Sequence, residues 1–204
     1  MNVNNMKNGN TPIRYDKEGT KNPIAKFLHF KFKSCIYELS STINFNNIID
    51  VGCGRGEILH FLENKYKNID NIYGIDLDEE IIMETLVNFQ NYKISHQNAN
   101  NLSFDNNFFD LALVLEVLEH AEDYNSIIKE VKRVTKQYCI FSVPREPLWK
   151  ILNLARGAHL KYWGNTPGHI NHWSSRDFEI LLAKHFNILK VVKPIPWTII
   201  LCEK

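Results

Sequence analysis

The sequence predicts an α/β protein with a doubly wound, mostly parallel sheet of seven strands and an antiparallel last strand. From Ile48 onward, short apolar runs alternate with helix-like segments, which is the pattern of such a sheet. The run LALVLEVL, residues 111–118, is apolar except for Glu116, as a parallel strand buried on both faces requires. The last two strands are separated only by KPIP, residues 193–196, so the final strand is expected to return antiparallel.

The elements follow from these patterns in chain order. Residues 1–22 are rich in Asn, Gly and Lys and offer little to bury, so a mobile arm is expected ahead of one domain over residues 23–204. Pro23 opens an apolar helix over residues 23–41, because Pro is tolerated in the first turn of a helix. Strands are expected at 47–51, 71–75, 92–96, 109–115, 138–143, 188–192 and 197–202, and further helices at 57–65, 79–89, 124–136 and 175–185.

Composition excludes several classes of protein. With 204 residues the chain is long enough for one domain with a sizeable core. Its formal net charge of +1 provides no large single-sign field to steer nucleic acid or an anionic membrane toward it. Four cysteines without a CxxC pair favour neither a zinc site nor a disulfide framework, which fits a reducing cytoplasm. A polar N-terminus and the lack of a long apolar run predict neither a signal peptide nor a membrane span.

A glycine-rich turn follows the first predicted strand, in IIDVGCGRGEI, residues 48–58. Ligands of such folds bind outside the carboxyl ends of the strands, where Gly52, Gly54 and Gly56 would allow a tight turn and a close approach to the main chain. A dinucleotide fingerprint requires a further glycine at position 57 and a pyrophosphate beside it. Glu57 stands there instead and would repel the pyrophosphate, which disfavours a dinucleotide oxidoreductase.

Three ordered motifs resemble those of the class I S-adenosylmethionine-dependent methyltransferases, in their small-molecule, ubiquinone-pathway-like branch. They are D-x-G-x-G-x-G from Asp50 to Gly56, YGIDLD with Asp76 twenty residues after Gly56, and HQNANNLSFDNNFFDLALVLEVLEH, residues 96–120. The resemblance implies a Rossmann-like fold, S-adenosylmethionine as cofactor, a carboxylate at position 76 for the ribose hydroxyls and an adenine contact at Asn98, where the family often has Asp. The implied cofactor-binding residues are Asp50, Gly52, Cys53, Gly54, Gly56, Asp76, Leu77, Asn98, Ala99 and Glu116.

A long insert separates the fifth strand from the helix that begins near Ser174. Residues 144–173 contain a short helix pattern, EPLWKILNLARG, with apolar residues at helical spacing, followed by a segment rich in aromatic residues and histidine. This segment would hang over the reactive end of the cofactor, so we interpret it as a lid for the methyl acceptor. An apolar flap that merely covers the sheet edge is the alternative. The lid's aromatic and histidine residues are Tyr162, Trp163, His169, His172 and Trp173.

Methyl transfer depends on holding the acceptor and the methyl group in line, and an oxygen or nitrogen acceptor must also lose a proton. The candidate bases are His169 and His172 in the lid and His120 at the end of the fourth strand.

The stretch from Glu116 to His120, E-x-x-E-H, also looks like the metal-binding motif of ubiquinone-pathway and small-RNA methyltransferases. Two carboxylates and an imidazole on one helical face would suit Mg²⁺ or Mn²⁺. Acids at a helix start are favourable without a ligand, so the expected site holds no metal.

The sequence therefore predicts a cytoplasmic methyltransferase acting on a small, hydrophobic or carrier-attached acceptor. An RNA or protein methyltransferase is the nearest alternative, and the near-neutral charge argues against a nucleic-acid partner. A non-catalytic partner subunit of the same fold is a further alternative, against which the intact glycines, Asp50 and Asp76 speak. Nothing in the sequence indicates the oligomeric state, the acceptor, or whether oxygen, nitrogen or carbon is methylated.

Overall fold

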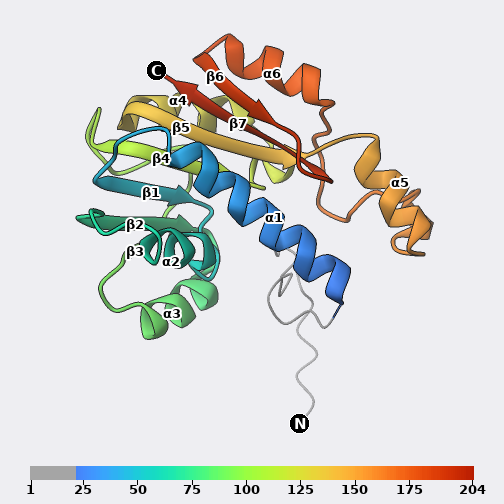
Figure 1. Ribbon diagram of the computed structural model, residues 1–204, viewed down its shortest axis with the longest axis horizontal. Helices are drawn as coiled ribbons and strands as arrows, with labels where there is room; N and C mark the ends of the chain where they lie inside the picture. The colour runs from blue at the N-terminus through green and yellow to red at the C-terminus, as the bar shows by residue number, and fades with distance from the viewer. Residues whose placement is uncertain (1–21) are drawn as a thin grey trace.

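Seven strands form one sheet in the order β3-β2-β1-β4-β5-β7-β6 in the computed structural model, which describes residues 22–204 (Figure 1). The first five strands run parallel, and β7 lies antiparallel between β5 and β6. The predicted fold class and the antiparallel last strand are confirmed. The strands are β1 (Asn47–Val51), β2 (Asn71–Asp76), β3 (Lys93–His96), β4 (Phe109–Leu115), β5 (Thr135–Pro144), β6 (Asn187–Val192) and β7 (Trp197–Glu203).

Helices cover both faces of this sheet. One face packs on α1, α2 and α3, and the other on α4 and α6, so apolar residues of each central strand point alternately into two cores. Ile48 of β1 belongs to the first core and Ile49 to the second. The helices are α1 (Pro23–Ser40), α2 (Glu57–Glu63), α3 (Glu79–Asn88), α4 (Tyr124–Val134), α5 (Leu148–Ala155) and α6 (Ser175–Ala183), with short 3₁₀ turns η1 (Leu118–His120) and η2 (Leu160–Tyr162).

Side-chain caps start several of these helices. The Asn22 side chain accepts hydrogen bonds from the main-chain N–H groups of Ile24 and Ala25 and so opens α1. Asp78 caps α3 and Ser174 caps α6 in the same way. The rest of the arm expected over residues 1–22 lies outside the described residues. Among the described residues, no helix combines the length and apolar character that a membrane span needs.

The main boundary error lies between α4 and β5. A helix to residue 136 and a strand from residue 138 are expected, but α4 ends at Val134 and β5 begins at Thr135. Thr135 has extended backbone and pairs with Phe109 of β4, while its hydroxyl donates to the carbonyl of Val131. A β-branched residue that returns a hydrogen bond to the last turn ends the helix here, and the strand gains residues at its start.

The carboxyl ends of the parallel strands meet at one edge of the sheet. Figure 1 shows that β1, β4 and β5 point toward the side on which α5 stands. Every loop that carries a predicted cofactor-binding residue therefore leaves the sheet at this edge, as expected for a ligand site of a doubly wound fold.

Candidate functional site

The glycine-rich loop after β1 is held by hydrogen bonds to β2 and α3. The N–H groups of Gly52 and Cys53 both donate to the carbonyl of Ile75, over 2.8 and 2.9 Å. The hydroxyl of Thr85 donates to the carbonyl of Gly54 over 3.0 Å. Neighbouring elements thus fix the loop main chain without using loop side chains.

All three glycines of the loop adopt positive φ angles, which favour glycine. Their surroundings differ. A Cβ added to Gly52 would lie 2.5 Å from Val117 Cγ2, and one added to Gly56 would lie 3.1 Å from Thr85 Cγ2. A Cβ on Gly54 would meet nothing within 4 Å. Gly52 and Gly56 are thus required by packing, whereas Gly54 leaves its main chain accessible from open space.

Asp76, at the end of β2, accepts two main-chain hydrogen bonds. Its Oδ2 accepts from the N–H of Gly54 over 2.9 Å, and its Oδ1 accepts from the N–H of Asp78 over 3.0 Å. Each carboxylate oxygen has a second lone pair, so Asp76 can hold the loop and still accept from a ligand hydroxyl. Leu77 follows with its side chain exposed beside it.

Two predicted contact residues of the glycine-rich segment are buried. Asp50 lies in β1 opposite Gly74 of β2 and is almost fully buried. Cys53 packs beside the same glycine, since a Cβ on Gly74 would lie 2.8 Å from its Sγ. Burial, reinforced by the charges of Asp50 and Asp76, raises the pKa of the Cys53 thiol far above its usual value. Cys53 therefore presents its main chain, rather than a reactive thiolate, to this edge.

The loop after β3 carries Asn98 and Ala99. Asn98 is exposed, and its Oδ1 accepts from the N–H of Asn100 over 2.9 Å, an arrangement that fixes the start of the loop. Ala99 packs against the core cluster on the α4 face of the sheet. The polar side chain that is expected to contact adenine thus stands at the same edge as Asp76, with one amide-oxygen lone pair already used.

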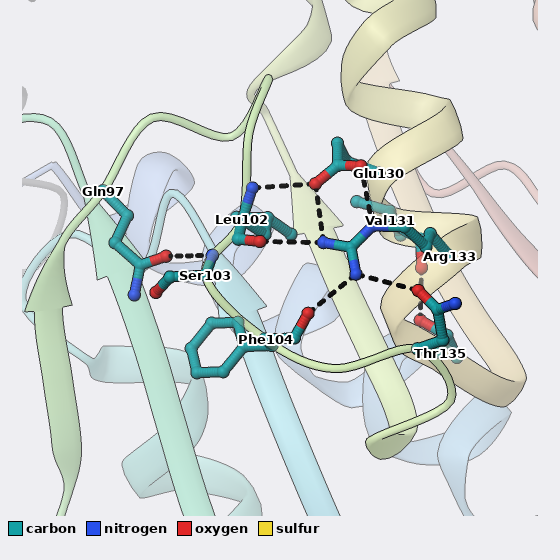
Figure 2. Close-up of polar contacts among 9 residues, drawn as sticks. Gln97, Leu102, Ser103, Phe104, Glu130, Val131, Arg133 and Thr135 are labelled. Carbon is teal, nitrogen blue, oxygen red and sulfur yellow. Dashed lines mark hydrogen bonds and ion pairs between the residues drawn. The ribbon is translucent and has the colours of Figure 1, made fainter.

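Two charged residues of α4, Glu130 and Arg133, support the same loop further along the chain, and we call this pair the buttress (Figure 2). Arg133 donates to the carbonyls of Leu102 and Phe104, each over 2.7 Å, and to both carboxylate oxygens of Glu130. Glu130 in turn accepts from the N–H of Leu102 over 2.8 Å. The hydrogen bonds from Arg133 hold the pKa of Glu130 below its usual value. Sequence reasoning missed this support because its residues are far apart in the chain and match no motif.

Glu116 lies just after β4 with a left-handed φ of 60°. Its carboxylate accepts from the hydroxyl of Ser142 over 3.2 Å and from the indole N–H of Trp197 over 2.7 Å. These contacts tie the end of β4 to β5 and β7. The helix considered for E-x-x-E-H does not start at Glu116, because the regular turn, η1, begins only at Leu118.

A cluster of Glu119, His120 and His169 forms where the lid meets η1. One potential ligand atom from each residue lies within 4.8 Å of the others. Glu119 is 1% exposed, and the two imidazoles meet edge to face with centroids 4.8 Å apart. His120 Nδ1 lies 2.9 Å from the carbonyl oxygen of Gly168, which can only accept, so Nδ1 carries a proton.

This donor set fits a divalent cation by its chemistry, but it differs from the implied motif. One carboxylate and two imidazoles suit metals such as Mn²⁺, Fe²⁺ or Zn²⁺. His169 replaces Glu116, which is bonded to Ser142 and Trp197 instead. The spacing along the chain predicted a site of Glu116, Glu119 and His120 on one helical turn. In the structure, the third residue beside Glu119 and His120 is His169, which comes from the lid.

The third candidate base, His172, does not join this cluster. Its Nδ1 lies 3.5 Å from Glu146 Oε1, at the start of the insert. Partial burial, followed by the charge of Lys150, lowers the pKa of His172 below its usual value, although Glu146 opposes the shift. His172 is therefore a neutral imidazole at pH 7, with a carboxylate facing one ring nitrogen. Trp173 beside it packs on Tyr124 and Phe178 as part of the core.

Backbone pairing joins the two ends of the insert, and hydrogen bonds attach its return segment to η1. Arg145 pairs with Trp173 in an isolated bridge, which brings the two ends of the insert together. The N–H groups of Ile170 and Asn171 donate to the carbonyl of Glu119, and the Asn171 side chain donates to the carbonyls of Leu118 and Ala121. The return segment of the insert thus lies against the turn that follows β4. Asn171 is a residue that no sequence pattern marked.

Comparison with known proteins agrees with this geometry. Residues 49–143 match the methyltransferase domain family. A demethylmenaquinone methyltransferase from Listeria monocytogenes (serotype 4a, strain HCC23) is 27% identical over 140 residues, which cover 63% of this chain and 59% of that protein. A methyltransferase from Aquifex aeolicus, described as S-adenosylmethionine-dependent, superposes with a TM-score of 0.69 at 16% identity, covering 89% of this chain and 93% of that one.

Residues 49–143 thus form a methyltransferase domain, in a chain that shares its fold with a solved S-adenosylmethionine-dependent methyltransferase. The magnesium protoporphyrin IX methyltransferase of Synechocystis PCC 6803, solved with bound S-adenosylhomocysteine, shares the fold with a TM-score of 0.68 at 19% identity over 91% of this chain and 89% of that one. This methyltransferase domain confirms the family that the three motifs indicated. The chain spans about three fifths of the length of the Listeria relative.

Proposed function

We propose that the chain transfers a methyl group from S-adenosylmethionine to a small-molecule acceptor that is hydrophobic or carrier-attached. The observation that carries the proposal is the juxtaposition of the bare Gly54 main chain with the Asp76 carboxylate at the carboxyl ends of β1 and β2. When bound, S-adenosylmethionine supplies an electrophilic methyl group on a sulfonium. The relatives named for demethylmenaquinone and for magnesium protoporphyrin IX support an acceptor with a flat ring system.

The cofactor-binding roles follow from the chemistry of each group. Asp76 would accept the ribose hydroxyls with its remaining lone pairs. Asn98 would accept from the adenine amino group, with Leu77 and Ala99 providing apolar contact to the ring. The main chain from Gly52 to Gly56 would lie along the amino-acid part of the ligand, where a Cβ on Gly54 would intrude. Asp50 and Glu116 would act mainly by holding the loops at the ends of β1 and β4, since Asp50 is buried and Glu116 is bonded to Ser142 and Trp197.

A histidine base in or beneath the lid would take the acceptor proton. His172 is neutral and faces Glu146, the arrangement in which a carboxylate orients an imidazole base. His120 and His169 are the other candidates, with Glu119 beside them. If those three residues held a cation, it would lower the pKa of an acceptor hydroxyl, and a separate base would not be needed. We keep the metal-free site as the proposal, because an acidic residue in the first turn of a helical segment, as Glu119 is, is favourable without a ligand.

A methyl-transfer assay tests the proposal. The full chain is incubated with labelled S-adenosylmethionine and a panel of hydroxylated quinols, porphyrin carboxylates and phenols, and products are read by mass spectrometry. We expect label in at least one ring acceptor, and none with the Asp76→Ala variant. Label that enters RNA or protein substrates but no small molecule would instead support the alternative acceptor class.

A further inference from the structure

Helix α5 of the lid leaves part of its apolar surface exposed, although its Trp149 packs on the core of the α1 face. Its buried residue is Asn153, 2% exposed, whereas Ile151 is 55% exposed and Leu154 is also exposed. The sequence pattern predicts the reverse, with the apolar stripe packed on the core. Ile151 and Leu154 therefore form an apolar surface on α5 that the described part of the chain does not cover.

The turn after α5 continues this surface. Leu160 and Tyr162 are exposed, and Trp163 is 83% exposed, the highest exposure of any large apolar side chain in the described residues. Trp163 has a left-handed φ of 52° and the next residue, Gly164, a φ of 78°. The backbone thus turns sharply at Trp163 and Gly164, and we call residues 160–164 the tip of the lid. The segment of the insert that contains α5 lies at the edge of the molecule beyond the strand ends (Figure 1).

Hydrogen bonds within the insert fix the backbone that carries these exposed side chains. The buried Asn153 donates to the carbonyl of Gly164 over 2.7 Å, and Trp149 donates through its indole N–H to Thr166 over 2.8 Å. Gly164 packs so closely on α5 that a Cβ would lie 2.3 Å from the Lys150 carbonyl oxygen. The tip is therefore braced against α5, and its apolar side chains are not simply part of a loosely attached loop.

The charged side chains of the stretch that carries this surface are all positive. Residues 147–176 contain no Asp or Glu, although the whole chain has 24 basic and 23 acidic residues. The basic residues of that stretch are Lys150, Arg156, Lys161 and Arg176. The near-neutral net charge, which argued against attraction to an anionic membrane, therefore hides a local excess of positive charge.

The first turns of α1 have the same character and lie close to the insert. Phe27 and Phe30 are exposed there. His29 of α1 and Trp149 of α5 both contact the indole of Trp197, with centroids 5.8 and 6.3 Å apart from it. The start of α1 and the lid thus flank the same tryptophan at the carboxyl edge of the sheet.

We propose that the lid tip docks on an anionic lipid bilayer. The docking surface consists of Ile151, Leu154, Leu160, Tyr162 and Trp163, with Lys150, Arg156 and Lys161 around it. Exposed Trp and Tyr rings suit the boundary between headgroups and acyl chains, and long basic side chains reach the headgroup charge while their stems stay in apolar surroundings. The excess of positive charge over residues 147–176 favours a negatively charged surface over a second copy of this tip, which would bring like charges together.

Vesicle sedimentation tests this docking without methyl transfer, so its failure leaves the proposed function standing. The full chain is mixed with vesicles of phosphatidylglycerol and phosphatidylcholine, or of phosphatidylcholine alone. We expect binding to the anionic vesicles that is about tenfold tighter than to the neutral ones and weakens as salt rises. Leu160→Ala with Trp163→Ala, and separately Lys150→Glu with Lys161→Glu, should each weaken it about tenfold.

The matched control is Met83→Ala with Val87→Ala, which removes two exposed apolar side chains from α3, far from the lid in the sequence. This variant should bind vesicles as the unchanged chain does. Circular dichroism and affinity for S-adenosylhomocysteine should be unchanged in all three variants, which excludes misfolding. Equal binding to both vesicle types, equal loss in the control, or a dimer in light scattering that the Leu160 and Trp163 substitutions abolish would overturn the proposal.

Discussion

The main-chain N–H of Gly54 donates to Oδ2 of Asp76 over 2.9 Å, so the carboxylate expected to bind ribose also fixes the loop expected to bind the rest of the cofactor. The same side chain accepts from Asp78 through its other oxygen. Asp76 therefore links β2 to the glycine-rich loop, and a substitution there changes both the contacts to a ligand and the shape of the loop.

Asp110 provides a matched control for Asp76. It accepts N–H bonds from Asn46 and Asn47 at the start of β4, as Asp76 accepts from two N–H groups at the end of β2. We expect Asp76→Ala and Asp110→Ala each to lower the free energy of unfolding by about 1–3 kcal/mol, because main-chain donors lose a charged acceptor. Only Asp76→Ala should weaken S-adenosylhomocysteine binding in calorimetry. Equal weakening by both would mean that Asp76 acts through stability alone.

Gly54 and Gly157 form a second matched pair, which tests whether the ligand occupies the open space beside Gly54. Gly54 and Gly157 have φ angles of 51° and 70°, and a Cβ on either meets nothing within 4 Å. Alanine at either position should cost about 1–2 kcal/mol of stability from its left-handed backbone. Gly54→Ala should also weaken S-adenosylhomocysteine binding by about tenfold or more, since the new Cβ would occupy the ligand's approach to the main chain. Equal affinity in the two variants would show that the ligand does not lie against Gly54.

The state of His172 predicts the pH dependence of methyl transfer. Burial and the charge of Lys150 lower its pKa, and only the neutral ring accepts a proton, so activity should fall on the acid side at a pH below about 6.5. The charge of Glu146 opposes this lowering of the His172 pKa, so Glu146→Gln should move the acid side of the activity profile to still lower pH. His172→Ala should lower kcat by about 10²–10⁴-fold. An unchanged pH profile in Glu146→Gln would remove His172 as the base.

Chelation distinguishes a histidine base from a bound metal at Glu119, His120 and His169. We expect EDTA to leave activity unchanged, because Glu119 in the first turn of η1 is favourable without a ligand. Activity lost to EDTA and restored by Mg²⁺ or Mn²⁺, in protein with an unchanged circular dichroism spectrum, would contradict the metal-free site. His169→Ala should then raise the metal concentration that is needed.

The buttress of Glu130 and Arg133 predicts a pH-dependent stability (Figure 2). Hydrogen bonds from Arg133 lower the folded pKa of Glu130. Its contribution is therefore present above the unfolded value of about 4.3 and is lost as pH falls through the lower folded value. Glu130→Gln should cost about 1–3 kcal/mol at pH 7, measured by urea unfolding, and the difference should shrink below about pH 4.

The control for Glu130 is Glu84→Gln, which breaks an exposed ion pair with Arg55. Exposed pairs contribute little, so this change should stay within about 1 kcal/mol at every pH. A pH-independent loss in Glu130→Gln would show that its packing, rather than its charge, supports the loop after β3.

The fold was predictable because its evidence is local. β1 and β4 have the expected bounds, since each is a short apolar run that ends at a turn or polar residue. The glycine-rich loop and Asp76 were predictable for the same reason, as each follows a strand end. The contacts that bring distant segments together were not, because no local pattern encodes them. His169 meets Glu119 only through the closed insert, and the outward face of α5 depends on Asn153 binding the Gly164 carbonyl.

The most direct test of the account is a calorimetric titration of the full chain with S-adenosylhomocysteine and, separately, with NAD. The account predicts saturable binding of S-adenosylhomocysteine, weakened in Asp76→Ala and unchanged in Asp110→Ala. It predicts no binding of NAD, because Glu57 stands where a pyrophosphate would lie. Binding of NAD without any response to S-adenosylhomocysteine would contradict it.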